Sequence, residues 1–286
     1  MSANPLQVHT RQSSPLGAWI QDLPERARIY RAGQPAPHIY LTELLDADFV
    51  LGMAREFPSG DLGLWTRYRH YNENKFGLTD WKLFPPALQQ AVLVLNSPFF
   101  VSLMSKLTGI PGLLPDPSLE GGGLHFCRRG GYLNLHSDFS MHHYNNGWRR
   151  RVNLILYLNP RWHDSWGGAI EFWDQNARAC FVKYPPRLNH AVIFNTDAVA
   201  LHGFPDPVTC PENETRKSLA LYYYTADGQS HRSSSTQYYA RSDDRVLTKL
   251  FVWLDKKVLS LYSRGKARFK FSDRFASRIL RLFSGR

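Results

Sequence analysis

Cysteine is scarce in this sequence of 286 residues. The three that occur, Cys127, Cys180 and Cys210, are odd in number, far apart, and form no Cys-x-x-Cys pair. This usage argues against a disulfide framework and against a thiolate zinc site. A reducing cytoplasm is the simplest environment for such a chain.

Long apolar runs are lacking as well. No stretch approaches the roughly 18 consecutive apolar residues that a membrane-spanning helix needs. The segment Met1–Gln7 has no basic group followed by an apolar run, so no secretory signal is expected, and the chain shows no internal repeat. With 43% hydrophobic and 21% charged residues, the composition is that of a soluble globular protein.

Charge is distributed unevenly along the chain. Residues 241–286 carry 13 Lys and Arg against four Asp, a net charge of +9 out of +11 for the whole protein. The other 240 residues are therefore close to neutral. The net charge of the whole chain suggests a nucleic-acid partner, but most of this charge belongs to a tail.

Three parts are expected along the chain. Residues 1–39, rich in Pro, Gln and Ser, are predicted to be an extended arm. Residues 40–228 are predicted to form the main domain and residues 229–286 a basic tail of amphipathic helices. The main domain begins with a helix over Thr42–Leu51, capped at its first residue, and a second apolar helix over Pro86–Leu107.

Short apolar or alternating runs bounded by Gly, Pro or Asn follow these helices. Eight such runs at this spacing predict a sandwich or barrel within one β domain. They are Leu124–Cys127, Tyr132–Asp138, Arg151–Leu158, Ala169–Trp173, Ala179–Val182, Ala191–Asn195, Ala200–Phe204 and Lys217–Thr225. The tail adds two helical patterns, over residues 246–261 and 271–283, each with an apolar face beside Lys or Arg.

One predicted strand ends in the triplet His136-Ser137-Asp138. A His-x-acid triplet occurs about once by chance in a chain of this composition, so its position matters more than its presence. Residues two apart on a strand point to the same face, which brings an imidazole and a carboxylate together. His202, on a later strand, offers a second imidazole. Two His and one carboxylate form the facial triad that binds non-haem Fe(II), with the opposite positions open for a co-substrate and O₂.

Arg216 lies 14 residues after His202, where an apolar strand begins. When 2-oxoglutarate chelates iron through its 2-oxo acid end, its distal carboxylate needs a buried cation as partner. A guanidinium suits this carboxylate best, because two parallel N–H donors match its two oxygens. Arg216 is therefore predicted to bind 2-oxoglutarate, and the hydroxyl of Ser218, on the same face, is predicted to add a hydrogen bond.

The order of these features resembles the prolyl 4-hydroxylase-like branch of the 2-oxoglutarate/Fe(II) oxygenases. Besides the iron ligands, the resemblance rests on Arg151 with Leu156–Asn159, on Gly167-Gly168 and on Arg216-x-Ser218, within about residues 120–226. It implies a mainly β fold with flanking helices at both ends of the chain. The core would be a double-stranded β-helix, or jelly roll, with the iron at its open end.

One position departs from that branch. Its members often have a tyrosine, nine or ten residues before the first ligand, that helps to bind 2-oxoglutarate. This chain has Cys127 and Phe126 there, so its co-substrate pocket is expected to differ in detail. Neither Tyr132 nor Tyr157 is assigned the missing role.

The resemblance implies a dioxygenase that hydroxylates an unactivated C–H bond and releases succinate and CO₂, with ascorbate in support. Because the carboxylate ligand Asp138 is present, unlike in related halogenases, hydroxylation is the expected outcome. The substrate stays open among a small molecule, a saccharide or lipid-linked saccharide, and a prolyl peptide. The run Phe139–Arg151 is expected to shape the entrance, where Arg149, Arg150 or Arg151 would meet an anionic group.

Two other functions are retained. Nucleic-acid demethylases on a similar scaffold usually carry a second arginine six residues after the first, where this chain has Tyr222, so nucleic acid is disfavoured as a partner. A jelly roll that binds without catalysis, docked through its tail, is the other alternative. For the tail itself, packing on the body, packing in a homo-oligomer and contact with the anionic inner face of a membrane all stay open.

Overall fold

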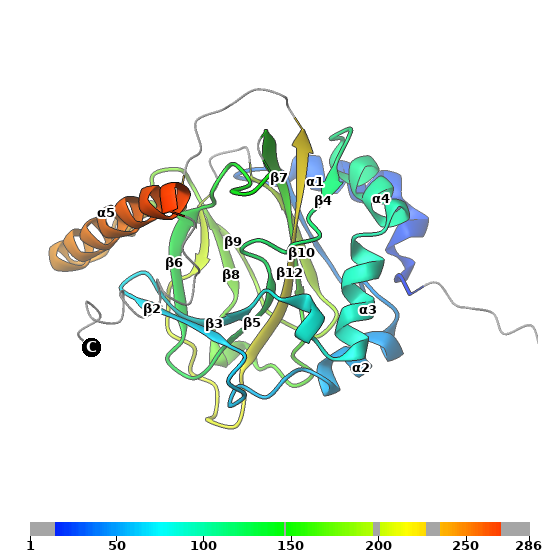
Figure 1. Ribbon diagram of the computed structural model, residues 1–286, viewed down its shortest axis with the longest axis horizontal. Helices are drawn as coiled ribbons and strands as arrows, with labels where there is room; N and C mark the ends of the chain where they lie inside the picture. The colour runs from blue at the N-terminus through cyan, green and yellow to red at the C-terminus, as the bar shows by residue number, and fades with distance from the viewer. Residues whose placement is uncertain (1–14, 146, 197–200, 227–234, 270–286) are drawn as a thin grey trace, which may run out of the picture.

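An antiparallel sheet, curled into a nearly closed barrel, forms the body of the protein (Figure 1). The computed structural model describes residues 15–145, 147–196, 201–226 and 235–269. The strands in these residues are β1 (His38–Leu41), β2 (Thr66–His70), β3 (Glu73–Leu78), β4 (Leu114–Pro115), β5 (Gly123–Cys127), β6 (Tyr132–Ser137), β7 (Trp148–Tyr157), β8 (Ile170–Trp173), β9 (Cys180–Tyr184), β10 (Ala191–Asn195), β11 (Leu201–Phe204), β12 (Arg216–Ala226) and β13 (Gln237–Tyr238).

The strand order shows how the sheet closes on itself. It runs β1-β10-β7-β12-β5-β3-β6-β11-β8-β9, with β2 on β3, β4 on β12 and β13 on β6. Phe172 of β8 packs against Phe194 of β10, although β8 and β10 are far apart in this order. The two ends of the sheet therefore face each other, and the predicted mainly β, jelly-roll core with flanking helices is confirmed.

The helices lie on two sides of the barrel. They are α1 (Leu23–Ala32), α2 (Ala47–Arg55), α3 (Pro86–Leu95), α4 (Pro98–Thr108) and α5 (Val246–Phe269), with short 3-10 turns at Ala18–Asp22, Trp81–Leu83 and Asp164–Trp166. Helices α1 to α4 cover one outer face, and α5 lies apart from them beside β6 (Figure 1). No single helix among the described residues is long and apolar enough to cross a membrane; α3 and α4, bent by 54°, meet that test only together.

Alternation along the central strands separates the hydrophobic core from the interior of the barrel. Leu154 of β7 and Leu219 and Leu221 of β12 point outward into the core formed with α1 to α4. Their neighbours Asn153 of β7 and Ser218 of β12 line a cavity inside the barrel. Successive side chains of a strand face opposite sides, so these strands are apolar on one face and carry polar groups on the other.

All eight predicted strands are confirmed, with boundaries shifted by three residues or fewer. The predicted helix at Thr42–Leu51 begins later. The side chain of Asp46 caps α2 by accepting hydrogen bonds from the backbone N–H groups of Asp48 and Phe49. The backbone N–H groups of Leu44 and Leu45 are instead bonded to Asn189. These tertiary bonds hold the segment after Thr42 out of the helix.

The second predicted helix is two helices. Its range is divided between α3 and α4, which meet at Asn96-Ser97. Ser97 caps α4 through its side chain, and Pro98 cannot continue α3 because it lacks a backbone N–H. The extended arm expected over residues 1–39 is also wrong where it is described. Residues 23–32 form α1, and Trp19 is buried in the core.

The predicted basic tail contains the strand β13, which pairs with β6, and then α5, which is joined to the barrel by a buried ion-pair network. His70, at the end of β2, lies 2.7 Å from Asp255 of α5 and 2.8 Å from Glu73 of β3. Burial lowers the pKa of His70, but the hydrogen bonds to these two carboxylates outweigh it and raise the pKa to about 9. The second helical pattern, over residues 271–283, lies outside the described residues.

This network predicts that the protein loses stability as the pH rises above neutrality. Because the pKa of His70 is raised in the folded state, its contribution is complete below about pH 6.5 and is lost as the pH passes about 9. The contribution is up to about 3 kcal/mol. We expect the free energy of unfolding to fall more between pH 6.5 and 9.5 in the wild type than in His70→Gln. Equal slopes for the two proteins would contradict this assignment.

Candidate active site

A cavity of about 270 Å³ lies inside the barrel. The side chains of His136, Asp138, His202, Arg216 and Ser218 all line it. These are the five residues that the sequence singled out, and the fold brings them together from β6, β11 and β12. Because they come from positions up to 82 residues apart, only the closed sheet could make them neighbours.

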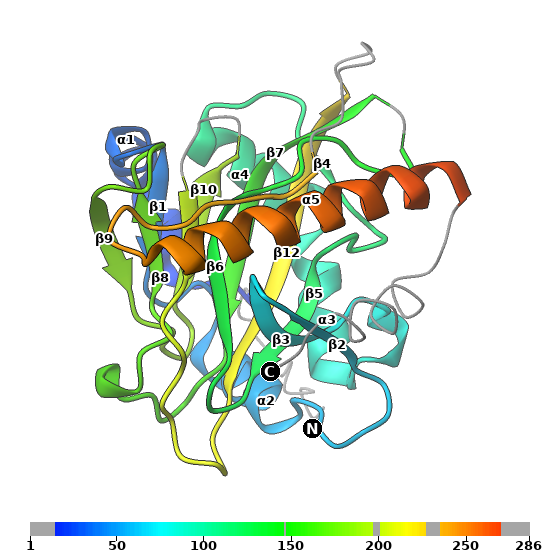
Figure 2. The ribbon, with the colours of Figure 1, turned by 90° about the vertical axis from the view of Figure 1, so that its left-hand side faces the viewer.

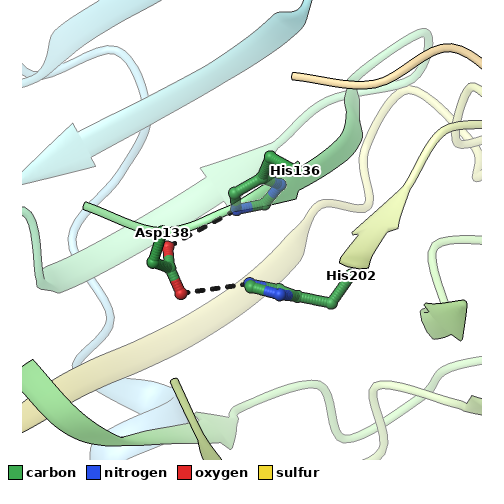
Figure 3. Close-up of side chains that lie close together, drawn as sticks. All are labelled: His136, Asp138 and His202. Carbon is green, nitrogen blue, oxygen red and sulfur yellow. Dashed lines mark ion pairs between the residues drawn. The ribbon is translucent and has the colours of Figure 1, made fainter. Parts of the chain in front are cut away.

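His136, Asp138 and His202 form a compact group of potential metal ligands (Figure 3). His136 of β6 and His202 of β11 are direct cross-strand partners, and their rings are 4.3 Å apart. Asp138 follows β6 and lies between them, with carboxylate oxygens 3.6 Å from His136 Nε2 and 3.3 Å from His202 Nε2. Three donor atoms within 4.8 Å of one another fit one metal ion. Among the described residues this is the one group with such geometry.

The protonation of the group favours metal binding. His136 Nδ1 donates a hydrogen bond to the carbonyl oxygen of Asn134, which leaves the lone pair of Nε2 directed at the group. Burial, with the neighbouring His202, lowers the pKa of His136 to about 3, so the ring is neutral. Burial raises the pKa of the Asp138 carboxyl, but the charge of Arg150 and the contacts with His202 and His136 outweigh it and hold the pKa well below its usual range. A neutral imidazole and an ionised carboxylate are the forms that bind a cation.

Two residues of β7 hold the carboxylate of Asp138 in position. Asn153 Nδ2 donates a hydrogen bond of 2.8 Å to Asp138 Oδ2. Arg150 Nε donates to Asn153 Oδ1 at 2.7 Å, and Arg150 Nη2 lies 3.4 Å from the same carboxylate oxygen. Such outer contacts fix the orientation of a ligand. Asn153 was not among the predicted residues, although an amide inside the otherwise apolar run Val152–Leu158 is a signal that could have found it.

Arg150 itself lies deeper than the sequence suggested. Arg150 is only 2% exposed, and its guanidinium lies against the rings of both Phe139 and Tyr222. Of the three arginines expected to shape the entrance, Arg150 is the one that lines the cavity. Its charge acts on the carboxylate of Asp138. Arg150 therefore stabilises one of the three potential metal ligands and does not form the entrance of the cavity.

Arg216 is a buried cation at the other side of the cavity. Its Nε donates to the carbonyl oxygen of Gly168 at 2.6 Å, and its Nη2 lies 3.4 Å from the hydroxyl of Tyr157. The ring of Phe204 lies 4.1 Å from the guanidinium carbon. No carboxylate in the described part of the chain forms an ion pair with Arg216. A buried, unneutralised guanidinium is a site for an anionic ligand.

The surroundings of Arg216 show how the cavity departs from the expected pattern. Cys127, at the position where related enzymes often carry a tyrosine, pairs in register with Arg216 from the neighbouring strand β5. Tyr157 reaches the guanidinium from β7 on the opposite side. Ser218, two residues along β12, pairs in register with Tyr157 and is 3% exposed. The hydroxyl beside Arg216 thus comes from Tyr157, to which the sequence assigned no role.

The other histidines of this region divide into two groups. His125 and His143 line the same cavity, away from the three donor atoms. His142 is buried beside Asp116 and Glu120 and fastens the segment between β6 and β7. Neither arrangement adds a fourth ligand to His136, Asp138 and His202.

Comparison with protein families identifies the segment that carries this cavity. Residues 122–224 match the family model described as "2OG-Fe(II) oxygenase superfamily". The matched segment runs from β5 to β12 and contains all five predicted site residues. No curated protein sequence matches the chain significantly.

Solved structures with the same fold include hydroxylases. A prolyl hydroxylase from Trichoplax adhaerens, in complex with a peptide fragment of the hypoxia inducible factor oxygen degradation domain, matches with a TM-score of 0.51 and 15% identity. The match covers 74% of this chain and 94% of that one. A Pseudomonas putida prolyl-4-hydroxylase matches with a TM-score of 0.48 and 18% identity, over 71% of this chain and 100% of that one. At 15% identity the likeness to the Trichoplax adhaerens enzyme is one of fold.

Proposed function

We propose that this chain, whose residues 122–224 match the 2OG-Fe(II) oxygenase superfamily, is a member that hydroxylates a C–H bond of an organic substrate bound in the barrel cavity. The observation that carries the proposal is the presence of two complementary sites in one cavity. One is the group His136, Asp138 and His202, and the other is the unneutralised guanidinium of Arg216. A cation and an anion that bind side by side are what Fe(II) and 2-oxoglutarate require.

The residues present fit both groups. His136, Asp138 and His202 would hold the iron on one side only, because the described residues offer no fourth ligand there. Arg216 would pair with the distal carboxylate of 2-oxoglutarate, and Tyr157 and Ser218 stand beside it with hydroxyl groups. When bound, Fe(II) and 2-oxoglutarate supply the O₂-dependent oxidation whose co-products are succinate and CO₂.

The chain itself orients the metal-binding side chains and restricts water around them. Asn153 and Arg150 keep the carboxylate of Asp138 turned toward the two imidazoles. Phe194 and Phe172 pack against the His202 ring, with centroids 4.6 Å and 6.1 Å from it. Aromatic walls restrict water around the ligands and hold the imidazole in one orientation. The side of the cavity lined by Tyr68, Phe139 and Tyr222 would receive the substrate.

The substrate class is a separate part of the proposal. Tyr68, Phe139 and Tyr222 offer flat apolar surfaces, which suit a saccharide ring or a prolyl ring equally. A small molecule, a saccharide or lipid-linked saccharide, and a prolyl peptide all fit these walls. A nucleic-acid demethylase is disfavoured, because Tyr222 stacks on Arg150 where such enzymes usually carry a second arginine.

Turnover without substrate tests the proposal. We expect purified protein given Fe(II), ascorbate and 2-oxoglutarate to form succinate slowly, with formation dependent on added iron. A jelly roll that binds without catalysis would form none. The oxygenase assignment would be ruled out if iron-loaded wild-type protein formed no succinate. It would also be ruled out if 2-oxoglutarate bound equally well with and without iron.

A further inference from the structure

Helix α5 exposes a row of large apolar side chains to solvent. Val246, Leu247, Leu250, Trp253 and Leu254 are all exposed, with Val246 at 82% and Trp253 at 52%. Spacings of three, four and seven residues place Val246, Leu250 and Trp253 on one side of the helix. A helix that only packed on the barrel would carry polar residues on this outer side.

The opposite side of α5 is fastened to the barrel. Val252 is 3% exposed, and Asp255 forms the buried ion pair with His70 described above. Phe251 stacks on Tyr71, with ring centroids 5.3 Å apart. Figure 2 shows α5 lying across the molecule in front of β6 and β12. The apolar row is therefore held in a fixed orientation and faces away from the body.

Basic side chains border the apolar row. Lys249 and Lys257 lie on either side of Trp253, and the Lys257 ammonium sits 5.5 Å from the Trp253 ring. In sequence, the same tail carries 13 Lys and Arg against four Asp over residues 241–286. Tryptophan and leucine flanked by lysine are typical of a helix that lies in the interface of an anionic bilayer, because the lysine stems reach the headgroups while the apolar groups enter the acyl region.

We propose that the outer face of α5 docks this protein on an anionic lipid bilayer. A second copy of the chain is a poorer occupant, since it would bring two tails of net charge +9 together. Nucleic acid would pair with the lysines but would leave Leu250, Trp253 and Leu254 uncovered. An anionic bilayer would both pair with the lysines and cover the apolar row.

Docking also places the cavity near the lipid surface. The strand β13, just before α5, pairs with β6 so that Tyr238 lies opposite His136. Tyr238 lines the cavity and stacks edge-on against His70, to which α5 is bound. The docking helix is thus joined to the cavity wall through two side chains. If the proposed oxygenase function holds, a substrate carried by a membrane lipid is favoured over a freely diffusing one.

Vesicle co-sedimentation of the full chain tests the docking independently of catalysis. The probes are phosphatidylcholine vesicles with and without phosphatidylglycerol. We expect binding to the anionic vesicles only, weakened by salt. The triple variant Leu250→Ser/Trp253→Ser/Leu254→Ser should bind at least about tenfold more weakly, and so should Lys249→Glu/Lys257→Glu. The matched control is Leu93→Ser/Phe99→Ser, which removes exposed apolar groups from α3 and α4 and should bind like the wild type.

Several outcomes would overturn the docking proposal. They are no binding of the wild type to anionic vesicles, unchanged binding of the triple variant, or equal loss in the control. A wild-type dimer that the triple variant converts to a monomer, measured by light scattering, would assign the face to a second copy. Tight binding of an oligonucleotide with no binding to vesicles would assign it to nucleic acid. Succinate formation and thermal unfolding should be unchanged in all variants, which would show that the fold is intact. Because these measurements do not depend on vesicles, they distinguish a failure of the oxygenase assignment from a failure of the docking proposal.

Discussion

Replacement of His136 by alanine should reduce succinate formation from 2-oxoglutarate by more than about a hundredfold. Loss of an outer contact to a metal ligand typically costs ten- to hundredfold in metal affinity or activity, and the loss of a ligand itself should cost more. Since His136 is buried and in register with His202, no other described side chain can replace its Nε2. The measurements are iron-dependent succinate formation and the equilibrium affinity for Fe(II) without oxygen.

A surface histidine provides the matched control for this variant. His163 is exposed and lies outside the cavity, so His163→Ala should keep wild-type turnover and wild-type affinity for iron. Thermal unfolding of both variants excludes a general loss of structure. Full iron affinity and turnover in His136→Ala would show that the metal binds elsewhere and would remove the basis for the proposed function.

Replacement of Arg216 by methionine should raise the KM for 2-oxoglutarate by two to three orders of magnitude. Removing one partner of a buried, hydrogen-bonded charge pair typically costs about 2–5 kcal/mol, and methionine cannot pair with the distal carboxylate. The kcat at saturating 2-oxoglutarate should change much less, because Arg216 lies apart from the three metal-binding side chains. Steady-state succinate formation at varied 2-oxoglutarate gives both quantities.

The fold should tolerate this change. No described carboxylate pairs with Arg216, so its removal leaves no unpaired buried acid. Lysine at this position should restore part of the affinity, since it keeps the charge but loses the two parallel donors. Arg161, whose side chain is 82% exposed and pairs with Glu214, provides the control Arg161→Met. An unchanged KM in Arg216→Met would assign the anion to another cation of the cavity, such as Lys75.

Much of the site follows from local periodicity. The alternation of β12 puts Leu219 and Leu221 on the outer face, and the same rule puts Arg216 and Ser218 on the inner one. His136 and Asp138 converge for the same reason, although Asp138 lies just beyond β6. A period of two is a property of the backbone, so the residues on one strand could be assigned to a face without knowledge of any other strand.

Where the sequence misled, tertiary hydrogen bonds or a capped proline break had displaced a helix preference. Thr42 is a good helix-capping residue, but α2 is capped at Asp46 instead, because Asn189 accepts hydrogen bonds from the N–H groups of Leu44 and Leu45. The apolar pattern of residues 86–107 is helical throughout, and the break before α4 comes from Ser97 and Pro98. Helix propensity contributes less than about 1 kcal/mol per residue, so a few hydrogen bonds or one proline outweigh it.

The sequence alone determined that His136 and Asp138 share one face of a strand, that Arg216 and Ser218 share one face of another, and that the basic charge belongs to the tail. Only the tertiary structure decided that His202 is the cross-strand partner of His136, that Asn153 and Arg150 hold Asp138, and that α5 turns its apolar row outward. The physical reason is the range of the interactions. Side-chain direction follows from neighbouring residues, whereas strand register and helix docking depend on contacts between segments far apart in the chain.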